Sequence, residues 1–227
     1  MKKLFVTGVA AVGSVIASSG FAADVPAYKG AVAAPSFNWT GLYLGGNLGY
    51  GKGSASGTVT ALGTTTSLGS ENLKGVIGGG QIGYNWQAGA MLLGVEADLQ
   101  GTGQKATTAL GGITQKDQIS SFGTVRARVG YAADRWLVYG TTGLGYGTFR
   151  SDLTVPGLGT DTSKSSRSAW VIGAGVEQAF ASHWTWKLEY LYLDTGKVAD
   201  TRTLPGVTFN TQVKDHVFRI GLNYLFN

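Results

Sequence analysis

Residues 217–226, close to the C-terminus, alternate in polarity with a period of two. One parity is wholly apolar or aromatic and consists of Phe218, Ile220, Leu222, Tyr224 and Phe226. The other parity contains Arg219 and Asn223. An extended strand points successive side chains to opposite faces, so this strand has one apolar face and one mixed face. A strand of this kind that ends on aromatic residues is typical of a membrane barrel, although a half-buried strand of a soluble sheet shows a similar pattern.

The same alternation recurs in seven earlier segments, which favours the membrane interpretation. We expect strands near residues 39–50, 74–86, 91–100, 119–131, 136–148, 169–180 and 184–193. The connections alternate between short ones near 87–90, 132–135 and 181–183 and long ones near 52–73, 101–118, 150–168 and 194–213. Short periplasmic turns and long outer loops are typical of bacterial outer-membrane barrels. The sequence therefore predicts an all-β fold, a closed transmembrane antiparallel up-and-down β-barrel of eight strands.

Composition and aromatic placement agree with a barrel. The body of the chain has no run of about 18 apolar residues, so it offers no membrane-spanning helix. Charged residues make up 14% of the chain and glycine contributes 37 residues, which argues against a helical domain. Aromatic residues gather at the end with the short turns, as an interfacial girdle would: Trp86, Tyr131, Trp136, Phe180, Trp184, Tyr224 and Phe226.

The N-terminus has the features of an export signal. Lys2 and Lys3 precede an apolar core, and small residues follow at Gly20 and Ala22. These features predict a signal peptide over residues 1–22, cleaved after about Ala22. We expect a periplasmic lead-in over 23–38 and a barrel domain over 39–227, located in the outer membrane. The basic residues are scattered through an exported chain, so no nucleic-acid partner is expected.

Eight ionisable residues fall on the parity that faces the barrel interior: Glu96, Asp98, Arg126, Arg128, Glu177, Lys187, Glu189 and Arg219. A lipid-facing Arg or Lys near the midplane would cost about 2–4 kcal/mol, which explains this sorting. Counted from the short turns, Glu96 stands level with Arg126 and Glu177 stands level with Lys187, so these two pairs are expected. The interior of an eight-stranded barrel is just wide enough for side chains, which favours a salt-bridged plug. The alternative is a charged pore constriction, with inward glycines such as Gly83 leaving room for water.

The sequence offers little for catalysis or cofactor binding. It has two histidines and no cysteine. His183 falls in a short periplasmic turn, and His216 near the outer rim has no serine at a suitable spacing, so no enzyme is expected. Haem needs an axial His, Tyr, Met or Cys, and only His216, Tyr50 and Tyr146 lie near the outer loops. We therefore expect no catalytic, cofactor-binding or metal-binding residues and no cofactor.

The end of the chain also contains a candidate assembly signal. Arg219, Gly221, Tyr224 and Phe226 resemble, in order and spacing, the C-terminal signal by which bacterial outer-membrane barrels are recognised for insertion. Asn227 is a departure, since it lies one residue beyond the usual terminal aromatic. The barrel-assembly machinery is therefore an expected partner during biogenesis.

Several segments together resemble a known family. They are W-T-G-L-Y-L-G-G-N-L-G-Y-G, G-G-G-Q-I-G-Y-N-W, G-V-E-A-D-L-Q-G-T-G, T-V-R-A-R-V-G-Y and R-I-G-L-N-Y-L-F. This set is similar to the outer-membrane immunogenic proteins of alphaproteobacteria, small porin-like barrels of which some are described as haemin-binding or as surface antigens. The resemblance implies the fold and the location, whereas fold does not fix activity.

The expected function is that of a surface protein with a structural or interaction role and a largely plugged, charge-lined interior. A small-solute porin and a haemin-binding protein are the alternatives. Expected partners are outer-membrane lipid and lipopolysaccharide, with small solutes or host and surface ligands as further candidates. The long loops are rich in Thr, Ser and Gly, and period-two patches near 153–155 and 201–210 predict hairpins that extend beyond the membrane. Such hairpins suit either variable antigenic loops or an adhesive surface.

Overall fold

The computed structural model describes residues 37–61, 63–110, 113–155, 159–200 and 207–226, and the regular structure in these ranges is entirely β. The strands are β1 (Gly41–Ala61), β2 (Thr64–Ala88), β3 (Met91–Thr102), β4 (Lys105–Leu110), β5 (Ile113–Ala133), β6 (Trp136–Val155), β7 (Gly159–Ala179), β8 (Trp184–Asp194), β9 (Val198–Asp200) and β10 (Val207–Phe226). Within these ranges no helix is long and apolar enough to cross a membrane.

Eight of these strands close into a barrel. The order of neighbours is β1, β10, β8, β7, β6, β5, β3 and β2, and β1 also pairs with β2, which completes the ring. All of these pairings are antiparallel. The short strands β4 and β9 pair with β5 and β10 in the hairpins beyond the ring. The eight-stranded antiparallel barrel predicted from the sequence is confirmed.

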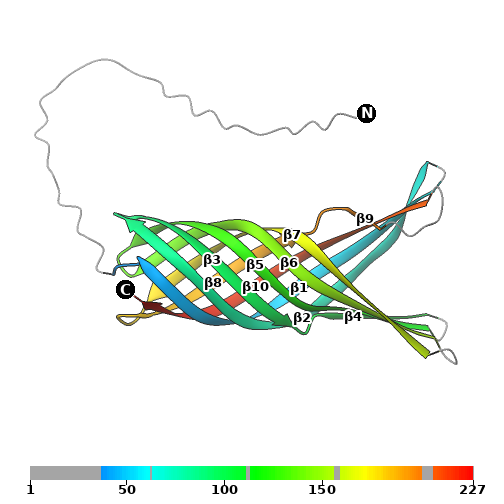
Figure 1. Ribbon diagram of the computed structural model, residues 1–227, viewed down its shortest axis with the longest axis horizontal. Helices are drawn as coiled ribbons and strands as arrows, with labels where there is room; N and C mark the ends of the chain where they lie inside the picture. The colour runs from blue at the N-terminus through cyan, green and yellow to red at the C-terminus, as the bar shows by residue number, and fades with distance from the viewer. Residues whose placement is uncertain (1–36, 62, 111–112, 156–158, 201–206, 227) are drawn as a thin grey trace, which may run out of the picture. The chain divides into compact units, whose positions relative to one another are not determined.

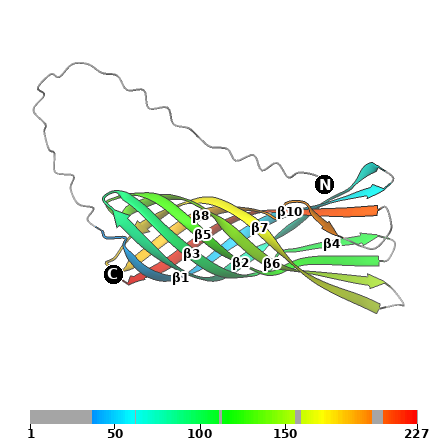
Figure 2. The same cartoon turned by 45° about the horizontal axis from the view of Figure 1, so that its top comes forward.

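The strands are longer than the lipid-facing alternation predicted. The segment 52–73 was expected as a loop, but β1 continues to Ala61 and β2 begins at Thr64, and β5, β6, β7 and β10 extend in the same way. Cross-strand pairs continue into these extensions, for example Thr60 with Thr65, whose hydroxyls lie 2.9 Å apart. β-Branched Thr and Val favour strand structure, so the ladder continues into water. The long hairpins project from one end of the barrel, while β1 begins and β10 ends at the other (Figures 1 and 2). The expected hairpin tips at 156–157 and 201–206 lie outside the described residues.

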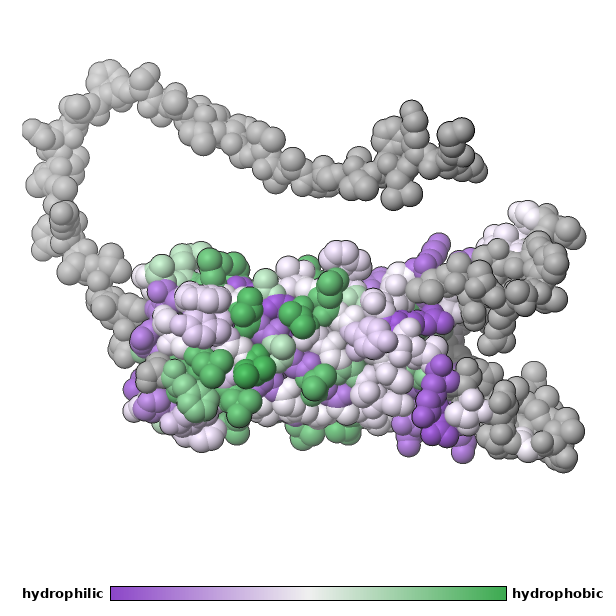
Figure 3. Space-filling model, in the orientation of Figure 1, coloured by the Kyte–Doolittle hydropathy of each residue, from purple (hydrophilic) through white to green (hydrophobic). Residues whose placement is uncertain are grey.

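Along the barrel wall, side chains alternate between the lipid face and the interior. In β3, Leu93, Val95 and Leu99 are exposed, whereas Glu96 and Asp98 are buried. Six of the seven predicted girdle residues are exposed, namely Trp86, Tyr131, Trp136, Phe180, Trp184 and Phe226, whereas Tyr224 is half-buried. Figure 3 shows apolar residues over the barrel wall and hydrophilic residues gathered where the long hairpins leave it. An apolar exterior suits a barrel in a membrane, because placing a charged side chain in contact with lipid is costly.

An apolar cluster occupies the interior at the short-turn end. Its members are Phe37, Trp39, Tyr43, Leu92, Ala132, Leu137, Tyr139, Ala179 and Leu225. Trp39 is fully buried, its ring packs edge-on against Phe37 at 4.9 Å, and its backbone N–H donates to Gln87 Oε1 at 2.8 Å. The sequence placed Trp39 at the start of the first strand and Phe37 in the lead-in. The strand instead begins at Gly41, because the two rings gain more by turning into the barrel than by facing water.

Candidate functional site in the barrel interior

The eight predicted interior charges meet in one network at the middle of the barrel. They come from β3, β5, β7, β8 and β10, and each residue is at most 4% exposed. The four carboxylates are Glu96, Asp98, Glu177 and Glu189, and the four cations are Arg126, Arg128, Lys187 and Arg219. The formal charges of the network therefore cancel. A buried charge is tolerated only when it is paired and hydrogen-bonded, and this composition meets the first condition.

Glu96 is the centre of the network. Its carboxylate pairs with Arg126 and lies 2.8 Å from Lys187 Nζ, 3.4 Å from Arg128 Nη1 and 3.3 Å from Arg219 Nη2. The Tyr43 hydroxyl also donates to Glu96 at 2.7 Å. Four cations thus share one carboxylate, and the other three acids complete the balance.

The remaining carboxylates each bind cations and neutral donors. Asp98 receives Arg126 at 2.9 Å, Arg219 at 3.1 Å and the Thr124 hydroxyl at 2.7 Å. Glu189 receives Arg219 at 2.6 Å and the Tyr139 hydroxyl at 2.8 Å. This combination of ionic and neutral donors is what a buried ion pair needs to offset its desolvation.

One of the two predicted pairs is present and the other is wrong. Glu96 pairs with Arg126, which stands opposite it in register. Glu177 stands opposite Lys187, but its partners are Arg128 at 2.8 Å, Thr185 at 2.5 Å and Asn223 at 2.8 Å. Lys187 crosses the lumen to Glu96 instead. Register fixes the positions of the Cα atoms. The charged end of a long side chain can pair with any opposite charge within its reach, and in a narrow interior that includes charges on strands across the lumen.

Two of the inward glycines lie against aromatic rings of the interior. A Cβ added at Gly83 would overlap the Tyr43 ring, and one added at Gly175 would overlap the Tyr139 ring. Each glycine therefore makes room for a tyrosine from a neighbouring strand. Both hydroxyls reach the charge network, and Arg128 lies over the Tyr139 ring at 3.9 Å from its centroid. The glycines thus serve the packing of the interior.

A second apolar cluster covers the network on the outer side, a layer that the sequence did not predict. Its members are Leu73, Ile77, Ile119, Phe122, Val171, Leu191, Leu193 and Val217. Ile119 and Phe122 both face inward because a bulge between Ile119 and Ser121 shifts the register of β5. A bulge inserts one residue without leaving a mark in the alternation, so parity counted along the sequence misplaces Ile119. The charges are therefore enclosed between two apolar layers.

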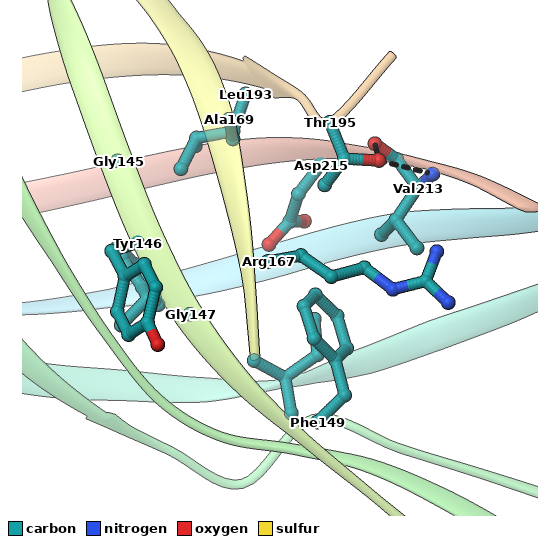
Figure 4. Close-up of a pocket in the computed structure, with 12 residues that line it drawn as sticks. Gly145, Tyr146, Gly147, Phe149, Arg167, Ala169, Leu193, Thr195, Val213 and Asp215 are labelled. Atoms are coloured by element: carbon teal, nitrogen blue, oxygen red, sulfur yellow. Dashed lines mark hydrogen bonds between the residues drawn. The ribbon is translucent and has the colours of Figure 1, made fainter. Parts of the chain in front are cut away.

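A small cavity of about 40 Å³ lies beside this outer layer. Phe149, Arg167, Thr195 and Asp215 are among its lining residues (Figure 4). Asp215 accepts two hydrogen bonds from Gln104 Nε2, both at 3.0 Å, and lies past the last lipid-facing residues of β1 and β10. Burial raises the pKa of Asp215 to about 6. Asp215 lies four residues before Arg219 and so shares its inward parity. This parity could have identified Asp215 as an interior residue from the sequence.

Other candidate positions stand apart from this interior. His183 stacks against Tyr224 at the short-turn end, and the outward-facing His216 lies 2.7 Å from the Tyr190 hydroxyl through Nδ1. No group of three or more His, Cys, Asp or Glu among the described residues is arranged to hold a metal ion. Gly221 pairs with Asn47, and the rings of Tyr224 and Phe226 meet edge-on at 4.9 Å. The role of Arg219, Gly221, Tyr224 and Phe226 as an assembly signal stays a prediction, as does the signal peptide.

Comparison with known proteins places this barrel in a family. The model of the outer membrane protein beta-barrel domain matches residues 13–226. The 31 kDa outer-membrane immunogenic protein of Brucella melitensis is 37% identical over 250 residues, covering 100% of both chains. The 22 kDa outer membrane protein of Rhizobium leguminosarum bv. viciae is 35% identical over 164 residues, covering 70% of this chain and 66% of the relative.

Among solved structures, Neisserial surface protein A is similar with a TM-score of 0.45 and 16% identity, covering 82% of this chain and 98% of the other. The family model and the Brucella relative each span most or all of the chain, and their names agree with the barrel described above. The chain therefore belongs to the outer membrane protein beta-barrel family, together with the outer-membrane immunogenic proteins, and is located in the outer membrane.

Proposed function

We propose that the protein is a structural and interaction protein of the bacterial surface, without catalytic activity, whose closed barrel anchors long outer hairpins. The observation that carries the proposal is the enclosed network around Glu96, in which Arg126, Lys187, Arg128 and Arg219 all lie within salt-bridge distance. The side chains of these residues have 0% exposure. Such an interior supports anchoring and leaves the hairpins as the surface available to partners.

The two apolar layers support a closed lumen. An ion crossing the barrel would have to pass Trp39 and Leu92 at one end, the charge network, and Ile77 and Leu191 beyond it. Each of these apolar residues is at most 1% exposed. Transfer of an ion through dry apolar packing is costly, so the closed state resists conduction. The immunogenic relatives support exposure of the hairpins to the outside, which suits an antigen-like role.

Planar-bilayer recording of the purified protein tests this proposal. We expect little or only intermittent conductance from the unmutated protein. A matched variant, Arg126→Ala, removes a long side chain from the network. It serves as a positive control that shows whether added space in the lumen produces conductance. Steady, ion-selective conductance of the unmutated protein, shifted towards cations by Arg126→Ala, would favour the small-solute porin instead.

The haemin-binding alternative has one observation in its favour. The Tyr190 hydroxyl and His216 Nδ1 form a pair at 2.7 Å on the outer surface, and His and Tyr both serve as axial ligands of haem iron. Titration of the protein with haemin, followed by the Soret absorption, distinguishes this alternative. A specific complex that is lost in both Tyr190→Phe and His216→Gln would support it, whereas identical spectra from all three proteins would exclude these residues as ligands.

A further inference from the structure

Three lysines form a row across neighbouring strands on the outer surface of the barrel. Lys52 on β1 pairs with Lys74 on β2, and Lys74 pairs with Lys105 on β4. All three are exposed and face away from the interior. Neighbouring strands lie about 4.8 Å apart, and like charges directly opposite each other destabilise a sheet. The row therefore carries an electrostatic cost that a bound anion would remove.

The row lies at the outer edge of the lipid-facing belt. On β1, Lys52 is the first outward residue after Tyr50, and on β2, Lys74 is the first beyond Val76. Leu42 to Lys52 spans about 25 Å along the barrel axis, given a rise of about 3.3 Å per residue and a strand tilt of about 40°. The apolar band of outer-membrane barrels is about 25 Å tall. The ammonium groups therefore stand at the level of the outer-leaflet headgroups.

No carboxylate of the described part of the chain neutralises the row. The salt bridges found there involve none of these three lysines. Asp215, which pairs with Gly53 next to Lys52, points inward to Gln104. Lys214 stands opposite Asp194 and so differs from the row. Within the described residues no carboxylate balances the three lysines, so the candidate counter-charge is an anion from outside the chain.

An open hollow of about 620 Å³ adjoins Lys52. Phe218 and Tyr190 line it on the membrane side, while Ser54 and Asn72 lie farther along the strands, beyond the apolar belt. This gradient from aromatic to polar matches an amphipathic molecule with acyl chains at one end and a polar headgroup at the other. A soluble anion has no apolar part that could pack against the aromatic side of the hollow.

We propose that Lys52, Lys74 and Lys105 bind the phosphate groups of an outer-leaflet glycolipid, the lipid A part of lipopolysaccharide. The ammonium groups supply the charge, and the hollow beside Phe218 and Tyr190 takes part of the acylated body. Cationic residues near an anionic membrane surface contribute about 1 kcal/mol each. This site is on the exterior and is independent of whether the lumen conducts, so it goes beyond the proposed function.

The test measures binding of lipid A to the purified, detergent-folded full-length protein. The variant Lys52→Gln/Lys74→Gln/Lys105→Gln removes the row, and Lys116→Gln/Lys164→Gln/Lys197→Gln removes three exposed lysines elsewhere as a charge-matched control. We expect the row variant to bind diphosphorylated lipid A at least about ten-fold more weakly, while the control stays within about two-fold. Lys52→Arg/Lys74→Arg/Lys105→Arg should retain binding, and Lys74→Gln alone gives the measurement if the triple variant fails to fold.

Two further ligands identify the source of the phosphate. Dephosphorylated lipid A should bind the unmutated protein as weakly as diphosphorylated lipid A binds the row variant. Inorganic phosphate at millimolar concentration should fail to displace lipid A. The proposal is overturned if the row variant binds normally, if the control loses as much affinity, if dephosphorylated lipid A binds equally well, or if inorganic phosphate displaces the lipid.

Discussion

The barrel holds two sets of charges that are arranged in opposite ways. The interior set combines four carboxylates with four cations, all buried, and its charges cancel. The exterior set, Lys52, Lys74 and Lys105, consists of cations alone, all exposed at the edge of the lipid belt. A charge enclosed by protein must find its counter-charge within the chain, whereas a charge at the headgroup level can take it from the membrane. Lysine therefore contributes to packing inside and, in the proposed lipid A site, to recognition outside.

The largest expected effect comes from removing the centre of the interior set. Glu96→Leu leaves Arg126, Lys187 and their neighbouring cations without their shared carboxylate, and breaking a buried pair costs about 3–5 kcal/mol. We expect that loss in the free energy of unfolding, measured by urea titration of the barrel in lipid vesicles. Lys74→Leu, on the exterior, is the matched control and should change it by less than about 0.5 kcal/mol. Equal effects of the two changes would contradict the contrast between the two sets.

Arg126→Ala should have a smaller effect, at or below the lower end of the roughly 3–5 kcal/mol expected when a buried pair loses one partner. Arg128, Lys187 and Arg219 remain around Glu96 after this change, although Asp98 and Glu189 each lose one partner. The unfolding titration checks the stability, and bilayer recording of the same sample checks the lumen. A variant of unchanged stability with a new cation-selective current would mean that water already fills the network.

Much of the interior follows from the sequence, because strict alternation and short turns fix which side chains face inward and at what height. Glu96 opposite Arg126 was readable for this reason. The partner of Lys187 was not readable from the sequence. Lys187 stands opposite Glu177 in register, but its ammonium group crosses the lumen to Glu96. Phe37 was assigned to the lead-in and Trp39 to the start of the first strand, and nothing in the pattern indicated that their two rings pack together inside the barrel. The row of lysines depends on pairing between β1, β2 and β4, which parity along one strand does not reveal.

A third prediction concerns the glycines that admit the interior tyrosines. Gly83→Ala should displace the Tyr43 ring and weaken its hydrogen bond to Glu96, at a cost of about 1–3 kcal/mol. Gly46 is a suitable control because its side of the strand faces lipid and an added Cβ meets only a backbone oxygen at 3.8 Å. We expect Gly46→Ala to leave the unfolding free energy within about 0.5 kcal/mol of the unmutated protein. Similar costs at the two glycines would argue that the Tyr43 ring does not need the space at Gly83.

The smallest expected effect involves Asp215, which lies between the two sets. It faces inward, as the network does, but it pairs with Gly53, next to Lys52, and accepts its hydrogen bonds from the neutral Gln104. Burial raises its pKa to about 6, above the ordinary value of 3.8, so the folded state binds the proton more tightly than the unfolded state. The stability that this proton adds is complete below about pH 4 and is lost as the pH rises through about 6.

Asp215→Asn removes this titration with little change of shape. Because all other titrating groups are shared, the difference in unfolding free energy between the two proteins isolates Asp215. At pH 7 the variant should be more stable by about 1–2 kcal/mol, with the gain disappearing near pH 4. A gain that is constant from pH 4 to pH 7 would mean that Asp215 titrates normally in the folded barrel, and that water reaches this level of the interior as freely as it reaches the exterior lysines.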